Sequence, residues 1–88
     1  MKRSENFVLK ELMGSFVLVP IGEAAMNLNG VITLNESAKF LWDAAEGEFV
    51  LDDLLDALIR EYEIDIQTAT NGAEIFLKRM KEEGCIIE

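Results

Sequence analysis

The side chains able to do chemistry in this sequence are a group of carboxylates and one thiol. Asp52, Asp53 and Asp56 stand close together in the chain, and Cys85 stands near its end. Neighbouring carboxylates can serve as general acid and base or bind a metal ion, and a cysteine thiolate can act as a nucleophile. Each of these roles needs a pocket that perturbs the pKa, a base beside the nucleophile, or converging ligands.

The surrounding residues argue against all three roles. There is no histidine in the chain, and Cys85 lies between Gly84 and Ile86, so we interpret it as a small buried apolar side chain. The three aspartates alternate with leucines at helical spacing, which is typical of a solvated helix face. We therefore expect no catalytic residue, no metal site and no cofactor, and we expect the function to be recognition.

Size and composition predict one small domain. The chain has 88 residues, of which 50% are hydrophobic, and we expect a single domain over 1–88 with a flexible segment at 1–6. A single cysteine and a charged start with no apolar run behind it predict a cytoplasmic protein. No apolar stretch approaches the ~20 residues of a membrane span.

The negative charge is concentrated in the middle of the chain. The net charge is −9, and residues 36–65 carry ten acids against two bases. Such a field repels nucleic acid, which argues against a DNA-binding module. It leaves open an acidic protein–protein adaptor or structural subunit that docks a basic partner through this face.

Three short strands come first. Residues 7–12 and 15–19 are apolar runs separated by Met13-Gly14, which predicts an antiparallel hairpin. Pro20-Ile21-Gly22 ends the second strand, and residues 23–30 form a connector that finishes with Asn29-Gly30. Residues 31–34 are then a third strand.

Three helices follow, and the fold class is therefore α+β. Asn35 is the N-cap of the first helix, which contains Trp42 as a core anchor and is ended by Gly47. Leucines at helical spacing predict the second helix over 51–62. Asp65 caps a third helix that runs to about Glu83, and a short strand or extended tail follows it. The core stripe of this third helix is Ile66, Ala69, Ala73, Phe76, Leu77 and Met80.

A second stripe on the third helix predicts a binding groove. Thr68, Gly72, Ile75 and Arg79 align beside the core stripe, and Ile75 points away from the core. Isolated exposed apolar residues are common, so a plain surface is the alternative. Glycine is also costly inside a helix, so either the helix begins after Asn71-Gly72 or a partner's backbone approaches there. We favour a groove in which an extended peptide adds a strand to the edge at 31–34.

The ordered series of motifs resembles the PqqD-like family, also called RiPP recognition elements, over roughly residues 7–88. The residues that carry the resemblance are Leu34-Asn35-Glu36-Ser37, Trp42, Gly47, Leu54, Leu58, Tyr62, Phe76-Leu77 and Gly84. Ala38 and Val50 depart from the family pattern in local capping only, whereas Asn71-Gly72 interrupts a helix that is usually better formed, at the proposed groove.

The resemblance implies a winged-helix-like fold, with an N-terminal three-stranded antiparallel sheet followed by three helices. It implies a non-catalytic protein that binds the leader segment of a ribosomally synthesised precursor peptide and presents it to a modifying enzyme, often a radical SAM enzyme. The implied peptide-binding residues are Val31, Ile32, Thr33, Leu34, Gly72, Ile75, Phe76 and Arg79, to which the stripe adds Thr68.

Overall fold

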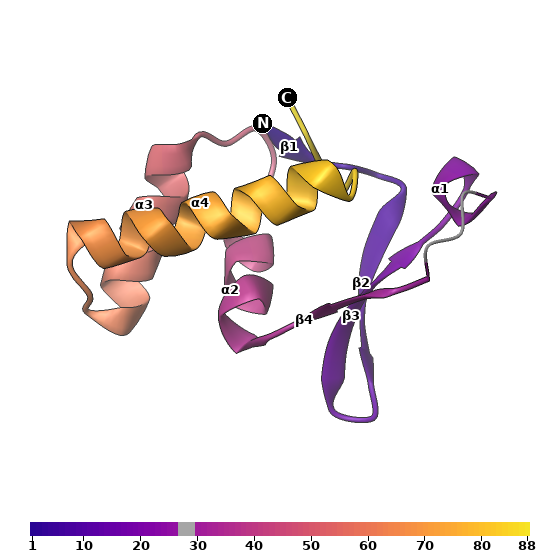
Figure 1. Ribbon diagram of the computed structural model, residues 1–88, viewed down its shortest axis with the longest axis horizontal. Helices are drawn as coiled ribbons and strands as arrows, with labels where there is room; N and C mark the ends of the chain where they lie inside the picture. The colour runs from indigo at the N-terminus through magenta and orange to yellow at the C-terminus, as the bar shows by residue number, and fades with distance from the viewer. Residues whose placement is uncertain (27–29) are drawn as a thin grey trace.

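The computed structural model describes residues 1–26 and 30–88. Its elements follow the order strand, hairpin, short helix, strand, three helices and a final strand (Figure 1). Their bounds are β1 Lys2–Arg3, β2 Phe7–Leu12, β3 Ser15–Pro20, α1 Glu23–Met26, β4 Ile32–Leu34, α2 Glu36–Ala44, α3 Leu51–Tyr62, α4 Ile66–Glu82 and β5 Ile86–Ile87.

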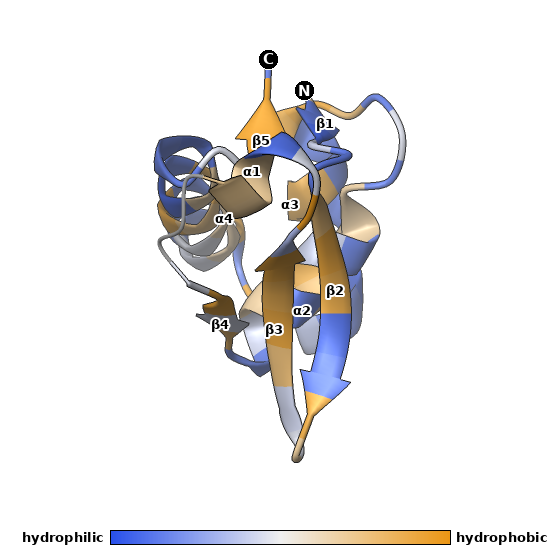
Figure 2. Ribbon diagram, turned by 90° about the vertical axis from the view of Figure 1, so that its right-hand side faces the viewer, coloured by the Kyte–Doolittle hydropathy of each residue, from blue (hydrophilic) through white to orange (hydrophobic). Residues whose placement is uncertain are grey.

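The three-stranded antiparallel sheet has the order β2-β3-β4, which confirms the α+β prediction. The hairpin turn at Met13-Gly14 has positive φ at both residues, 52° and 83°, as a tight two-residue turn requires. In β4 the central residue Thr33 stands opposite Val17 of β3. Figure 2 shows β3 between the other two strands, so β4 lies at the edge of the sheet on the side of α4.

The connector before β4 is partly helical. Residues 23–26, within the expected connector, form α1, and the expected turn residue Asn29 lies outside the described residues. Gly30 has a φ of 78°, in agreement with the prediction for the end of this connector. Val31 was expected in the strand, but β4 begins one residue later and Val31 is 51% exposed.

The helix starts agree with the predicted caps. The side chain of Asn35 accepts a hydrogen bond of 2.8 Å from the backbone N–H of Ala38, and Asp65 accepts one of 2.8 Å from Thr68. These bonds satisfy backbone donors that the first turn of a helix leaves free. The end of α2 comes earlier than predicted, because Ala45 is already its C-cap and Gly47 follows in the loop.

α4 is continuous through Asn71-Gly72. The alternative that the helix begins after this pair is therefore wrong. The predicted core stripe is buried except for Ile66, which is 59% exposed because it stands at the first position of the helix, beyond the packed core. Trp42 and Cys85 are both buried, as predicted.

The two ends of the chain pair with each other. Lys2–Arg3 and Ile86–Ile87 form a small antiparallel sheet, and the termini lie side by side in Figure 1. The side chain of Arg3 lies 5.5 Å from the centroid of the Trp42 ring. Backbone pairing and a cation–π contact thus place β1 against the core, within the segment that we expected to be flexible.

Within the described residues, none of the helices has the length and apolar character needed to span a membrane.

The hairpin β2–β3 extends away from helices α2, α3 and α4, whereas β4 leads directly into α2 beneath α4 (Figure 1). This arrangement places the end of the sheet edge next to two helices.

Candidate functional site

The edge of β4 is connected to α4 by one side chain. Nη2 of Arg79 donates a hydrogen bond of 3.1 Å to the carbonyl oxygen of Thr33. Ile32 and Leu34 turn their side chains into the core, while the Thr33 side chain is exposed. Since N–H and C=O of one residue in an extended strand point to the same side, both backbone groups of Thr33 face α4 and not β3.

A pocket of about 200 Å³ opens between the N-terminal half of α2 and the exposed side of α4. We call it the α2–α4 pocket. It is lined by Asn35, Ser37, Ala38, Leu41, Gly72, Ile75, Phe76, Arg79 and Met80. Its inner part is apolar, since Leu41, Phe76 and Met80 belong to the core. Among the described residues, Arg79 is the only charged one that lines it.

The structure brings together four of the five predicted groove residues on α4. Gly72, Ile75, Phe76 and Arg79 all line the α2–α4 pocket. Ile75 is 71% exposed, whereas Phe76 is buried. Thr68 is not among the lining residues, and its backbone N–H is used in the cap of α4.

The sequence reasoning missed the wall that α2 supplies. Asn35, Ser37 and Ala38 line the pocket, although we had assigned Asn35 only to capping. The hydroxyl of Ser37 donates a hydrogen bond of 3.1 Å to the Asn35 side chain, so both are fixed at the rim. The sequence did contain a signal for this wall, because α2 begins directly after β4. A helix that starts where an edge strand ends must pass close to whatever faces that edge.

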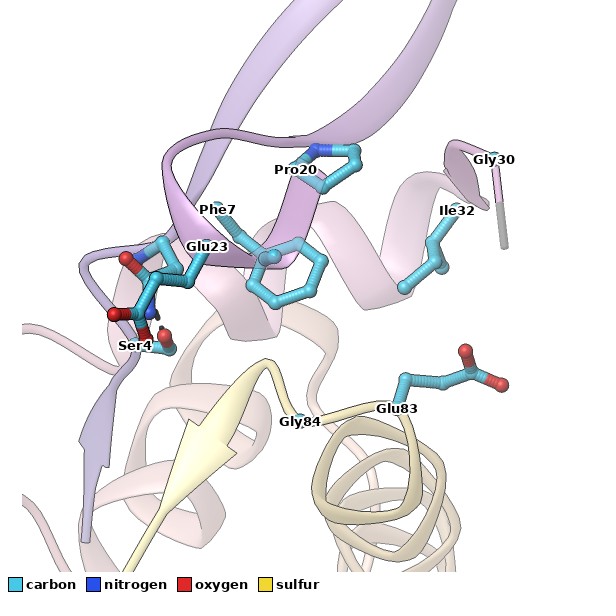
Figure 3. A pocket seen from close by; sticks show the side chains of 10 residues that line it. Ser4, Phe7, Pro20, Glu23, Gly30, Ile32, Glu83 and Gly84 are labelled. Carbon is cyan, nitrogen blue, oxygen red and sulfur yellow. Dashed lines mark hydrogen bonds between the residues drawn. The ribbon is translucent and has the colours of Figure 1, made fainter. Parts of the chain in front are cut away.

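A second pocket lies at the other end of β4 and was not predicted. We call this cavity of about 280 Å³ the hairpin pocket. Figure 3 shows the Phe7 ring in its middle, with Ile32 and Glu83 on one side and Ser4 and Glu23 on the other. Its lining residues are Ser4, Asn6, Phe7, Pro20, Glu23, Ala24, Gly30, Ile32, Glu83 and Gly84.

The two pockets lie near opposite ends of the line along which β4 faces α4, and we call this line the β4–α4 cleft. Ile32 and Glu83 line the hairpin pocket, while Asn35 and Gly72 line the α2–α4 pocket. The numbering rises along β4 and falls along α4 from the first pocket to the second, so the two elements run antiparallel. Arg79 lines the α2–α4 pocket, and its contact with Thr33 joins β4 to the wall of that pocket. An extended peptide in this β4–α4 cleft would have the Thr33 backbone beside it and a side-chain pocket at each end.

The thiol and the carboxylates of the described residues are not grouped into a reactive site. Burial raises the pKa of the Cys85 thiol to about 11, which keeps it protonated and inert at neutral pH. Among residues 1–26 and 30–88, no three histidine, cysteine or acidic residues are grouped so that they could hold a metal ion. The hydrogen bond from Thr68 holds the pKa of Asp65 below its ordinary value, an effect that belongs to the cap of α4.

Comparison with known proteins bears on the family and the fold. The family model described as coenzyme PQQ synthesis protein D (PqqD) matches residues 16–86. The solved structure titled "TbiB1 in Complex with the TbiA(beta) Leader Peptide" superposes with a TM-score of 0.76 at 20% identity, covering 97% of this chain and 93% of that one. No curated protein matches the sequence.

Proposed function

Because this chain belongs to the PqqD family, we propose that it binds the leader segment of a ribosomally made precursor peptide in the β4–α4 cleft. Members of this family are non-catalytic peptide-binding chaperones. In our proposal the leader adds as an extended strand to the edge of β4 and is presented to a modifying enzyme. Thr33 would supply the central backbone hydrogen bonds, and the α2–α4 pocket would take a side chain.

One observation carries this proposal. The backbone of Thr33 faces α4, and across the cleft it meets only the side chain of Arg79 among the described residues. An edge strand with unpaired N–H and C=O groups is a template for another strand. The apolar pocket beside it would add specificity, because alternate side chains of an added strand point into it.

Nuclear magnetic resonance tests the proposal directly. Isotope-labelled protein is titrated with synthetic leader segments of the precursor peptides encoded beside its gene. We expect amide shifts at Ile32–Leu34 and Gly72–Arg79, and dissociation constants of about micromolar or tighter, which correspond to about −8 kcal/mol. The amides of α3 should shift little, because its residues do not line the cleft.

Two isoleucines on α4 provide a matched pair of variants. Ile75→Glu places a charge in the α2–α4 pocket, whereas Ile66→Glu places the same charge at another exposed position of the helix outside it. We expect the first to abolish binding and the second to leave it unchanged. Equal affinities of both variants, or leader-induced shifts confined to other surfaces, would contradict the proposal.

We further propose that the modifying enzyme is a radical SAM enzyme and that the complex forms in the cytoplasm. The family resemblance supports the enzyme class, and a lone buried thiol is compatible with a reducing compartment. Size-exclusion chromatography of the protein with a leader and the radical SAM enzyme encoded nearby should give a ternary complex. A neighbouring enzyme of another class that alone captures the leader-loaded protein would contradict this part.

A further inference from the structure

Arg79 already occupies one of the backbone groups that an added strand would need. Its guanidinium donates to the carbonyl of Thr33, which is the central acceptor on the free edge of β4. A bound strand would bring its own N–H to this carbonyl, so the guanidinium must give up or share the bond. Strand addition therefore changes the surroundings of Arg79 in every bound state.

The released guanidinium needs a new partner. Arg79 has no carboxylate within 4.0 Å in the described part of the chain, although the protein carries a net charge of −9. A peptide lying in the cleft would cover part of it, and a covered charge without an acceptor is costly. A carboxylate satisfies it best, because two parallel N–H···O bonds match the planar fork of arginine.

We propose that Arg79 selects peptides with an acidic side chain two residues away from an apolar side chain. The inference rests on the proposed function, since it assumes an extended peptide on β4. Residues opposite Ile32 and Leu34 turn to the side of the helices, and successive residues on that side are about 6.8 Å apart. Along α4, one turn separates Ile75 from Arg79, a rise of about 6 Å. One side chain thus enters the α2–α4 pocket while the next on the same side meets Arg79.

The test is an mRNA-display selection from a random library of 12-residue peptides. The full chain is used as wild type, as Arg79→Gln, and as the matched control Lys78→Gln, which removes a neighbouring cation that does not line the cleft. We expect wild type and Lys78→Gln to enrich Asp or Glu at two residues from a large apolar residue. Arg79→Gln should enrich the apolar residue alone.

A double-mutant cycle then measures the contact between Arg79 and the acidic side chain of the peptide. One selected peptide and its Glu→Gln or Asp→Asn analogue are titrated against wild type and Arg79→Gln. The analogue should bind wild type about tenfold more weakly, the coupling expected of a partly desolvated charge pair. Arg79→Gln should bind both peptides within twofold of each other, and should bind the analogue at least as well as wild type does, since no guanidinium is left unpaired.

The outcomes separate this inference from the function on which it rests. Two results would each overturn the role of Arg79 and leave the cleft as the binding site. In the first, selected peptides shift the amides of Ile32–Leu34 without any acidic preference. In the second, the acid-to-amide change costs the same affinity with wild type and Arg79→Gln. If no selected peptide shifts those amides, the cleft itself is wrong. Thermal denaturation of Arg79→Gln beside Lys78→Gln establishes that both variants are folded.

Discussion

Replacing Gly72 with alanine should stabilise the protein and weaken peptide binding. Gly72 lies inside the continuous helix α4, and a Cβ added there would meet no atom within 4 Å. Alanine is favoured over glycine by about 0.8–1.0 kcal/mol in a helix interior. With no steric cost to subtract, we expect the free energy of unfolding to rise by about 1 kcal/mol. For a domain of this size the melting temperature should rise by about 4–8 °C.

Gly84 provides the matched control for this substitution. A Cβ at Gly84 would also meet no atom within 4 Å, but φ there is +77°, in the left-handed region. An alanine in that region costs about 1 kcal/mol or more. Thermal denaturation followed by circular dichroism should therefore show opposite shifts for Gly72→Ala and Gly84→Ala. A fall in the melting temperature of Gly72→Ala would refute the reasoning, because it would mean that the open space beside Gly72 is filled.

The same variant decides why a glycine stands in this helix. Gly72 lines the α2–α4 pocket, so the added methyl group takes room from a cavity of about 200 Å³. If a peptide approaches closely at this point, its affinity should fall by about tenfold, or 1.4 kcal/mol, within the usual cost of overpacking. Titration of a leader peptide measures this. Unchanged affinity in a stabilised protein would show that the glycine has no part in binding.

Three further changes test other parts of the description. Thr33→Pro removes an N–H that faces the cleft and not β3. Peptide affinity should therefore fall at least about tenfold, while circular dichroism shows an intact sheet. Unchanged affinity would contradict strand addition. Burial raises the pKa of Cys85 from 9.0 to about 11, so the unfolded chain loses this proton first and stability should fall as pH rises from about 9 to about 11. Urea denaturation should show that Cys85→Ala lacks this fall, and iodoacetamide at pH 9 should modify native Cys85 far more slowly than the unfolded chain. The pKa of Asp65 lies below its ordinary 3.8 because Thr68 donates to it, so stability is present above pH 3.8 and lost as pH falls through the lower value. Asp65→Asn should flatten this acid limb, and an unchanged limb would contradict the assignment.

Local signals in the sequence were sufficient for the principal elements. The hairpin followed from two apolar runs around Met13-Gly14, and the starts of α2 and α4 followed from Asn35 and Asp65. Each of these depends on residues within a few positions of one another, where capping and turn chemistry decide the backbone. The α4 wall of the cleft followed in the same way from helical periodicity.

The features that were missed depend on contacts between distant parts of the chain. β1 has only two residues, too few for an alternating pattern, and it exists because the ends of the chain meet; its partner β5 was expected as a short strand or an extended tail. Ile66 fits the helical stripe by spacing, but the core ends before the first turn of α4 and leaves it exposed. The contact between Arg79 and Thr33 spans 46 positions in the sequence. No periodicity encodes such a contact.

The position of Arg79 also bears on how the protein keeps an open edge without pairing to its own copies. Edge strands are protected in other folds by short length, charge or covering groups. β4 has only three residues, and the Arg79 guanidinium covers its central carbonyl. The opposite edge strand of the sheet, β2, carries the exposed charges of Lys10 and Glu11. A second copy of β4 would have to displace Arg79 while bringing only Ile, Thr and Leu side chains, so the displaced charge would be left without a carboxylate. A peptide with a suitably placed acid compensates for that loss, and one side chain can thus both cover the edge and select what replaces it.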